Sequence, residues 1–173
     1  ATLAFSTIAN NDKVGVIFFS DKIEKFIPAQ KGKTHVLHII RELLSFEPTS
    51  TGTDMAQALQ YFSNAQKRHC TAFLISDFIG VEGLEKPLMI ASNRHEVNAI
   101  QIYDRRETEL PNMGLVKFHD AETGQDLWVD TAVASVREQY ASEWKQNQIR
   151  IEQLCTKTGV KRMSVRTDED YVK

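Results

Sequence analysis

The stretch that decides the fold is "TSTGTDMAQALQYF", which runs from Thr49 to Phe62. Its apolar side chains recur at helical spacing and predict an amphipathic helix over 54–67. The side chains facing the core are expected to be Met55, Ala58, Leu59 and Phe62. Thr51 or Thr53 can cap this helix, and Asp54 suits the positive end of the helix dipole. Because the oxygen of Thr53 can also bind a cation, the stretch is both a helix start and a candidate ligand site.

Apolar runs without alternation lie on both sides of this helix, and they predict strands buried on both faces. The strands are expected at 14–20, 70–78, 97–104 and 160–166. Further helices are expected at 34–46, 84–93 and 132–157, with a short helical end before residue 10. A second strand, "IEKFIPA", follows the first at once, and Pro28 favours an antiparallel edge strand there. Two short extended runs around 120–124 predict a hairpin.

Three finer predictions concern a helix cap and the packing of side chains. In the helix over 34–46, Thr34 is expected to be the cap. The core-facing side of that helix is expected to carry Val36, Leu37, Ile40, Leu43 and Leu44. Trp128 and Trp144 are expected in the core or at its border, given their spacing.

Strands that alternate with helices predict an α/β fold with an open, mostly parallel, doubly wound sheet and helices on both faces. At 173 residues the chain fits one domain, 1–173. Reactive groups of such sheets lie at the carboxyl ends of strands. Ser20-Asp21 and Ser76-Asp77 lie at such ends, and the loop with Thr53 enters its helix from the same side if the connections are right-handed.

Composition excludes several classes of function. The formal net charge is −2 with scattered basic residues, so a nucleic-acid partner is not expected. No apolar run is long enough to span a membrane, and a cytoplasmic location is expected. Cys70 and Cys155 belong to no paired motif, which favours two free thiols.

The oxygen-bearing side chains leave alternatives open. A hydroxyl from Thr53 and a carboxylate from Asp77 suit Mg²⁺ or Mn²⁺, yet each residue can equally serve only its own loop. Asp77 could instead be a phosphoryl-accepting nucleophile of a metal-dependent phosphohydrolase. His35 with His38, and His119 with Asp120, are weaker candidates that lack a third ligand. The cluster 104–107 is expected to be a solvated loop with internal ion pairs.

Two motifs in this order resemble those of a known fold. "GTDMAQAL" followed by "FLISDF" is similar to the second and third metal-site segments of the von Willebrand factor A domain. The wider set is made of "NNDKVGVIFFSDKIEKFIPAQKGKTHVLHIIRELL", "IQIYDRRETELP", "DAETG" and "RTDEDY". It resembles a bacterial family of this fold that is often encoded beside MoxR-type AAA ATPases.

The resemblance implies a protein-interaction module and not an enzyme. Thr53 and Asp77 match the threonine and closing aspartate of a metal-ion-dependent adhesion site, where an acidic partner side chain completes the coordination of the cation. The implied partner is a MoxR-type AAA ATPase, which the protein would serve as adaptor or recognition factor.

One part of the family pattern is absent. No Asp-x-Ser-x-Ser occurs between Ala1 and Lys173, so the first metal loop and the first, central strand are expected to be missing from this chain. Cation binding by this chain is therefore expected to be weak or absent. A vestigial site on a metal-free interaction domain is the remaining alternative.

Overall fold

The computed structural model of the protein describes residues 2–119 and 124–169. The chain divides into two compact units, Ala1–Phe62 and Ser63–Lys173. The prediction of one domain over 1–173 therefore stays a prediction.

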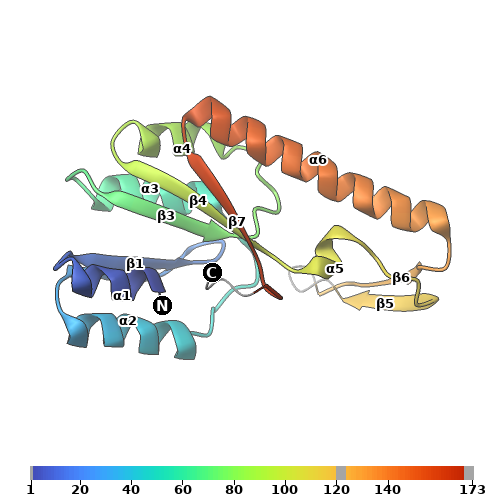
Figure 1. Ribbon diagram of the computed structural model, residues 1–173, viewed down its shortest axis with the longest axis horizontal. Helices are drawn as coiled ribbons and strands as arrows, with labels where there is room; N and C mark the ends of the chain where they lie inside the picture. Colours follow the sequence, from blue (N-terminus) through green and yellow to red (C-terminus); the bar gives the residue numbers. More distant parts are fainter. Residues whose placement is uncertain (1, 120–123, 170–173) are drawn as a thin grey trace. The chain divides into compact units, whose positions relative to one another are not determined.

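The first unit is an antiparallel strand pair covered by helices (Figure 1). It contains α1 (Thr2–Ala9), β1 (Val14–Phe19), β2 (Ile23–Gln30), α2 (Lys33–Ser45) and the start of α3 (Met55–Ala65). Ile17 of β1 pairs with Phe26 of β2, which confirms the expected antiparallel neighbour. α2 packs against both α1 and β1. The core of this unit is formed by Phe18, Ile27 and Ile39, with Val14, Val16 and Phe46 packed against them.

Three predictions about this unit are wrong. β1 is only partly buried, because it has a single neighbouring strand among the described residues and one partner cannot cover both faces. In α2 the buried residues are Val36 and Ile39, whereas Leu37, Leu43 and Leu44 are exposed. The helix also begins one residue before Thr34, with Gly32 at the N-cap and no side-chain cap. The side of α2 that was predicted to face the core is therefore not the side that contacts β1.

The second unit is built on a three-stranded parallel sheet, ordered β3-β4-β7 (Figure 1). Leu74 of β3 pairs with Ala99 of β4, and Ala99 pairs with Arg162 of β7. Its elements are β3 (Thr71–Ser76), α4 (Glu85–Ser92), β4 (Glu96–Tyr103), α5 (Arg105–Thr108), β5 (Leu115–His119), β6 (Asp126–Asp130), α6 (Ala134–Thr158) and β7 (Lys161–Arg166).

Helices α4 and α6 supply much of the core of the second unit. They pack against each other, α4 also contacts β4 and α6 also contacts β7. Leu88 of α4 and Ile151 of α6 are fully buried. α6 ends as predicted at Gly159, whose φ of 69° is the left-handed value that favours glycine at a helix end.

Burial again differs from prediction at two places in this unit. β3 buries only Leu74, because it is an edge strand of the described sheet with β4 on one side alone. Trp128 lies on β6 with 62% of its surface exposed, since the β5–β6 pair is a separate two-stranded sheet. Trp144 is half-buried against the ring of Tyr103, as expected.

The architecture is a mixed α/β fold with one parallel sheet and two antiparallel strand pairs. The predicted hairpin is confirmed as the antiparallel pair β5–β6, in which Val116 faces Val129. Its turn at 120–123 lies outside the described residues. A wider, doubly wound sheet is not part of the described structure.

Candidate functional site

The end of β1 and the start of α3 are joined by a backbone hydrogen bond. Ser20, a buried residue directly after β1, accepts this bond from the N–H of Asp54 at 2.8 Å. Gly52 lies against Asp21, so that a Cβ added to Gly52 would stand 3.3 Å from the Cβ of Asp21. Thr53, which is exposed, is therefore placed at the carboxyl end of β1. This is the position that the sequence predicted for its loop.

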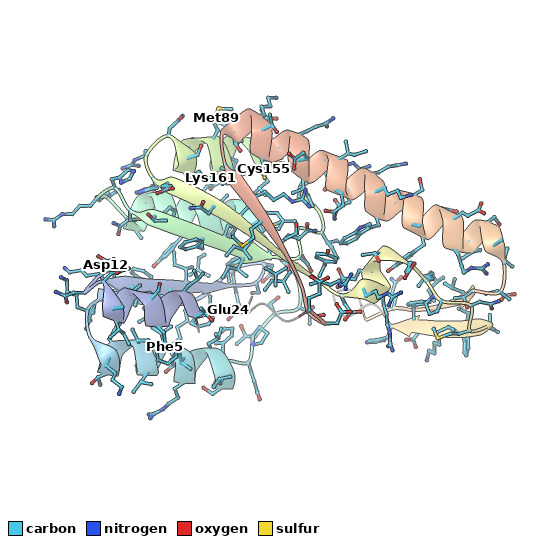
Figure 2. All side chains as sticks on the ribbon, viewed as in Figure 1. Phe5, Asp12, Glu24, Met89, Cys155 and Lys161 are labelled. Carbon is cyan, nitrogen blue, oxygen red and sulfur yellow. The ribbon has the colours of Figure 1, made fainter. Side chains whose placement is uncertain are left out.

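Glu24 ties the same two loops together a second time. Its carboxylate accepts hydrogen bonds from the Oγ of Ser20 at 2.8 Å, the N–H of Thr49 at 3.0 Å and the Oγ1 of Thr49 at 2.7 Å. These bonds, that of the Thr49 side chain first, lower the pKa of Glu24 below its ordinary value. Glu24 is labelled in Figure 2, at the start of β2.

Asp54 provides the capping oxygen of α3. Its Oδ1 accepts a hydrogen bond of 2.8 Å from the N–H of Gln57, three residues along the chain. Asp54 itself is half-buried, whereas Thr53 beside it is exposed. The predicted helix start is confirmed to within one residue. The capping oxygen found is that of Asp54, whereas the sequence had indicated Thr51 or Thr53 as the cap.

Asp77 presents an exposed carboxylate at the carboxyl end of β3. Its Oδ1 accepts hydrogen bonds from the Oγ of Ser76 at 3.2 Å and from the N–H of Ile79 at 3.1 Å. The next residue, Phe78, is fully buried and has a φ of 57°. A bulky side chain rarely adopts this left-handed conformation, because its Cβ crowds the following carbonyl oxygen. The surroundings must therefore hold the turn in place.

Two amide side chains that no sequence motif marks bond to this turn. The Nε2 of Gln101 donates to the carbonyl oxygen of Asp77 at 3.1 Å, and the Nδ2 of Asn147 donates to that of Phe78 at 3.2 Å. Gln101 lies in the middle of β4 and is fully buried. A glutamine within the apolar run of a strand was the signal that could have identified it.

Thr53 belongs to the first unit and Asp77 to the second, and the structure describes each in its own unit. Their joint binding of a cation stays a prediction. Within residues 2–119 and 124–169, no three His, Cys, Asp or Glu side chains gather in an arrangement that could hold a metal ion. The donors present at Thr53 and Asp77 are the hard oxygens that Mg²⁺ prefers, but a complete site needs further oxygen ligands.

The weaker histidine candidates are engaged in local contacts. The Nε2 of His35 lies 2.9 Å from the carbonyl oxygen of Val14, whereas His38 faces Glu42. His119 pairs with Asp126 at 2.8 Å, and Asp120 lies outside the described residues. These contacts account for the histidines without a metal.

The charge cluster after β4 forms a capping box at the start of α5. Asp104 accepts a hydrogen bond from the N–H of Arg106, and Glu107 accepts one from the N–H of Asp104. Arg105 pairs with Glu109. Within 104–107 the carboxylates accept capping hydrogen bonds from backbone N–H groups, whereas the ion pair of Arg105 goes to Glu109 outside the cluster. The prediction of internal ion pairs is therefore wrong, and the segment is a short helix and not a loop.

The free state predicted for both cysteines is confirmed. Cys155 is buried and Cys70 half-buried, and burial raises the pKa of both thiols. A raised pKa keeps a thiol protonated and unreactive, so neither group indicates a nucleophilic site.

Residues 1–150 match the model of a family described as "Protein of unknown function DUF58". Among the curated relatives, the uncharacterized protein Rv1480 of Mycobacterium tuberculosis is 27% identical over 176 residues, covering 99% of this chain and 55% of that protein. The uncharacterized protein MAV169 of Mycobacterium avium is 29% identical over 150 residues, covering 84% of this chain and 87% of that protein. The chain thus spans about half the length of the first of these relatives.

Two solved structures share the fold. An aerotolerance-related membrane protein from Bacteroides fragilis has a TM-score of 0.58 and 16% identity, covering 95% of this chain and 79% of that one. The conserved hypothetical protein BatB from Bacteroides thetaiotaomicron has a TM-score of 0.50 and 17% identity, covering 91% and 85%.

The expectation of a cytoplasmic location is contradicted by these comparisons, because the first of the two solved neighbours is a membrane protein. That expectation rested on the lack of an apolar span in the sequence, and such a lack does not decide where a protein resides. In the described part of the chain, none of the helices combines the length and the apolar character needed to cross a membrane.

Proposed function

Starting from the DUF58 family, to which the chain belongs, we propose that the protein is a protein-interaction module and not an enzyme. The observation that supports a binding site is the Asp77 turn, in which an exposed carboxylate stands beside a buried residue with a left-handed backbone. The choice of a protein ligand over a substrate is supported by the motif resemblance. Strained backbone of this kind collects at ligand-binding and active sites, where the surrounding structure maintains it. The proposed role of Asp77 is to bind a ligand through this carboxylate, whose turn is fixed by the hydrogen bonds described above.

The finer proposal is a von Willebrand factor A-like fold that contacts its partner through a divalent cation. Thr53 and Asp77 would each offer one oxygen, and an acidic side chain of the partner would complete the coordination. Support for the joint site comes from the motif resemblance, and within the second unit from the exposed carboxylate of Asp77 at the end of β3. The cation is Mg²⁺ or Mn²⁺, and its affinity for this chain is expected to be weak, because an Asp-x-Ser-x-Ser loop is absent from the sequence.

The cation proposal is tested by adding Mn²⁺ to the ¹⁵N-labelled chain, because paramagnetic broadening reports even weak binding. We expect broadening centred on the amides of 52–54 and 76–79. Asp77→Asn and Thr53→Val should each weaken it about tenfold or more. The matched controls are Asp12→Asn and Thr156→Val, which change exposed residues elsewhere.

Absence of broadening in the wild type would reject the cation and leave a metal-free interaction domain. Turnover of p-nitrophenyl phosphate that disappears in Asp77→Asn would reject the whole proposal in favour of a phosphohydrolase.

The proposed partner is a MoxR-type AAA ATPase, with the protein acting as its adaptor or recognition factor. This partner is supported by the motif resemblance alone. The direct test is interferometry with a purified MoxR-type ATPase from the same organism, with and without Mg²⁺. The proposal is supported if binding to the ATPase weakens both in the Asp77→Asn variant and when EDTA removes the Mg²⁺. Equal binding in all conditions would contradict binding through a cation.

A further inference from the structure

The Asp77–Phe78 turn is held by one donor from the sheet and one from a helix. Gln101 of β4 bonds to the carbonyl oxygen of Asp77, and Asn147 of α6 bonds to the carbonyl oxygen of Phe78. These are two consecutive peptide groups, and they flank the left-handed residue. Fixing both carbonyls leaves the backbone between them little freedom to rotate.

Arg162 of β7 decides which way the amide of Gln101 points. One of its terminal nitrogens donates to the Oε1 of Gln101 at 2.6 Å. A guanidinium has donors only, so it must face the oxygen of the amide. The NH₂ group of Gln101 is thereby turned towards the carbonyl oxygen of Asp77. Since Gln101 is fully buried, water cannot take over either bond.

Arg162 is in turn held from α6. The same guanidinium donates to the side-chain oxygen of Gln148, and its other terminal nitrogen lies 3.4 Å from a carboxylate oxygen of Glu152. Both residues lie on α6, as does Asn147. The bonds therefore run from α6 through β7 and β4 to the turn, while Asn147 reaches the turn directly.

The geometry points to Gln101 and Asn147 as positioning residues for the Asp77 carboxylate, with Arg162 acting through Gln101. They hold the Asp77 and Phe78 peptide groups so that the carboxylate stays at the end of β3. That these residues hold the turn follows from the hydrogen bonds alone. That they thereby assist ligand binding rests on the proposed function of Asp77.

The test replaces a donor by an acceptor of nearly the same shape. Gln101→Glu keeps an oxygen facing Arg162 but turns a second oxygen towards the carbonyl of Asp77, where the two repel. Asn147→Asp makes the same change at the carbonyl of Phe78, from a half-buried position that tolerates substitution better. Matched controls are Gln153→Glu and Gln146→Glu, both exposed on α6.

The first readout is exchange of the Ile79 amide hydrogen, which bonds to the Oδ1 of Asp77 in the native turn. We expect this hydrogen to exchange at least tenfold faster in Gln101→Glu and Asn147→Asp, and at the wild-type rate in both controls. The amide of Thr167, which bonds to the carbonyl oxygen of Tyr103, should be unchanged and shows that the sheet is intact. Unchanged exchange at Ile79 in both variants would overturn the inference.

The second readout is Mn²⁺ broadening around 76–79 in the same variants. Mn²⁺ broadening that is tenfold weaker in Gln101→Glu and Asn147→Asp, but normal in the controls, would support the positioning of the Asp77 carboxylate by these residues. If broadening is normal in all variants while Ile79 exchange is faster, the positioning of the carboxylate is contradicted. If the wild type shows no broadening, the cation proposal fails, and the exchange of Ile79 alone decides whether the turn is held as inferred.

Discussion

The N–H of Asp54 donates a hydrogen bond of 2.8 Å to the carbonyl oxygen of Ser20, and so joins the start of α3 to the end of β1. Glu24 connects the same two loops through Ser20 and Thr49. One connection uses backbone atoms and the other a carboxylate. Only the second therefore depends on pH.

Replacing Glu24 with glutamine should reduce stability in a pH-dependent way. Hydrogen bonds from Thr49 and Ser20 lower its pKa in the folded protein below the ordinary value of 4.5. A lowered pKa means that ionised Glu24 stabilises the fold above the unfolded pKa, and that this stability is lost as the pH falls through the folded pKa. At neutral pH the wild type should have a higher melting temperature than Glu24→Gln.

The difference in melting temperature should shrink once the pH falls below about 4.5, the ordinary value for this carboxyl. Glu47→Gln, at an exposed position of the same unit, is the control. A difference that stays constant down to acidic pH would show that the Glu24 carboxylate is not what stabilises the loops.

Glycine at position 78 should be less harmful than alanine. Phe78→Ala loses a fully buried ring, which costs about 3–5 kcal/mol in comparable cores. Phe78→Gly loses the same ring but relieves the left-handed backbone, which favours glycine by about 1 kcal/mol. Urea denaturation should give a higher free energy of unfolding for the glycine variant than for the alanine variant. At Phe73 in β3 we expect the opposite, with the alanine variant more stable than the glycine variant. If glycine were the more stable variant at both positions, or alanine at both, backbone strain at Phe78 would be contradicted.

Two isoleucines of α6 provide a matched pair for the core of the second unit. Ile151 is fully buried and Ile149 is 57% exposed. Ile151→Ala should lower the free energy of unfolding by about 2–5 kcal/mol, because it removes buried methyl groups and leaves a cavity. Ile149→Ala should stay within about 0.5 kcal/mol of wild type. Equal losses in chemical denaturation would show that α6 packs by another face.

Gly15 in β1 should not accept a side chain. A Cβ there would stand 2.8 Å from the carbonyl oxygen of Ile27 and 2.9 Å from the nitrogen of Ala29, both backbone atoms of β2. Gly15→Ala should destabilise the first unit by about 1–3 kcal/mol, since the strand pair must shift.

Gly52→Ala is the comparison, because its new methyl would meet only the side chain of Asp21, at 3.3 Å. Its loss of stability should be smaller. If both variants unfold alike, β2 does not approach Gly15 as closely as the structure has it.

The sequence predicted where most helices and strands lie. Met55, Ala58 and Leu59 are buried on α3 as their spacing indicates, and Gly159 ends α6. Local signals of this kind depend on neighbouring residues, and these are visible in the sequence. Which face of a helix is buried was less predictable, because Leu37 and Ile39 are equally apolar and only the contact of α2 with β1 selects Ile39.

The candidate site was predictable only in part. Asp77 follows an apolar strand and Thr53 precedes a helix, so the order of elements located both residues, but only the motif resemblance singled them out as ligands. Gln101 and Asn147 could not be assigned to the turn, because they lie 24 and 69 residues away from the carbonyls that they bond. The left-handed backbone of Phe78 was equally hidden, since neither glycine nor asparagine marks it.

The contact between Arg162 and Gln101 also affects how this part of the molecule appears to a crystallographer. In an electron-density map the oxygen and nitrogen of a glutamine side chain look alike, and their assignment is ordinarily a choice. Here the donors of Arg162 make that choice, because only the oxygen can face them. The amide of Asn147 is assigned in the same way, because the carbonyl oxygen of Phe78 can only accept and must face its NH₂ group.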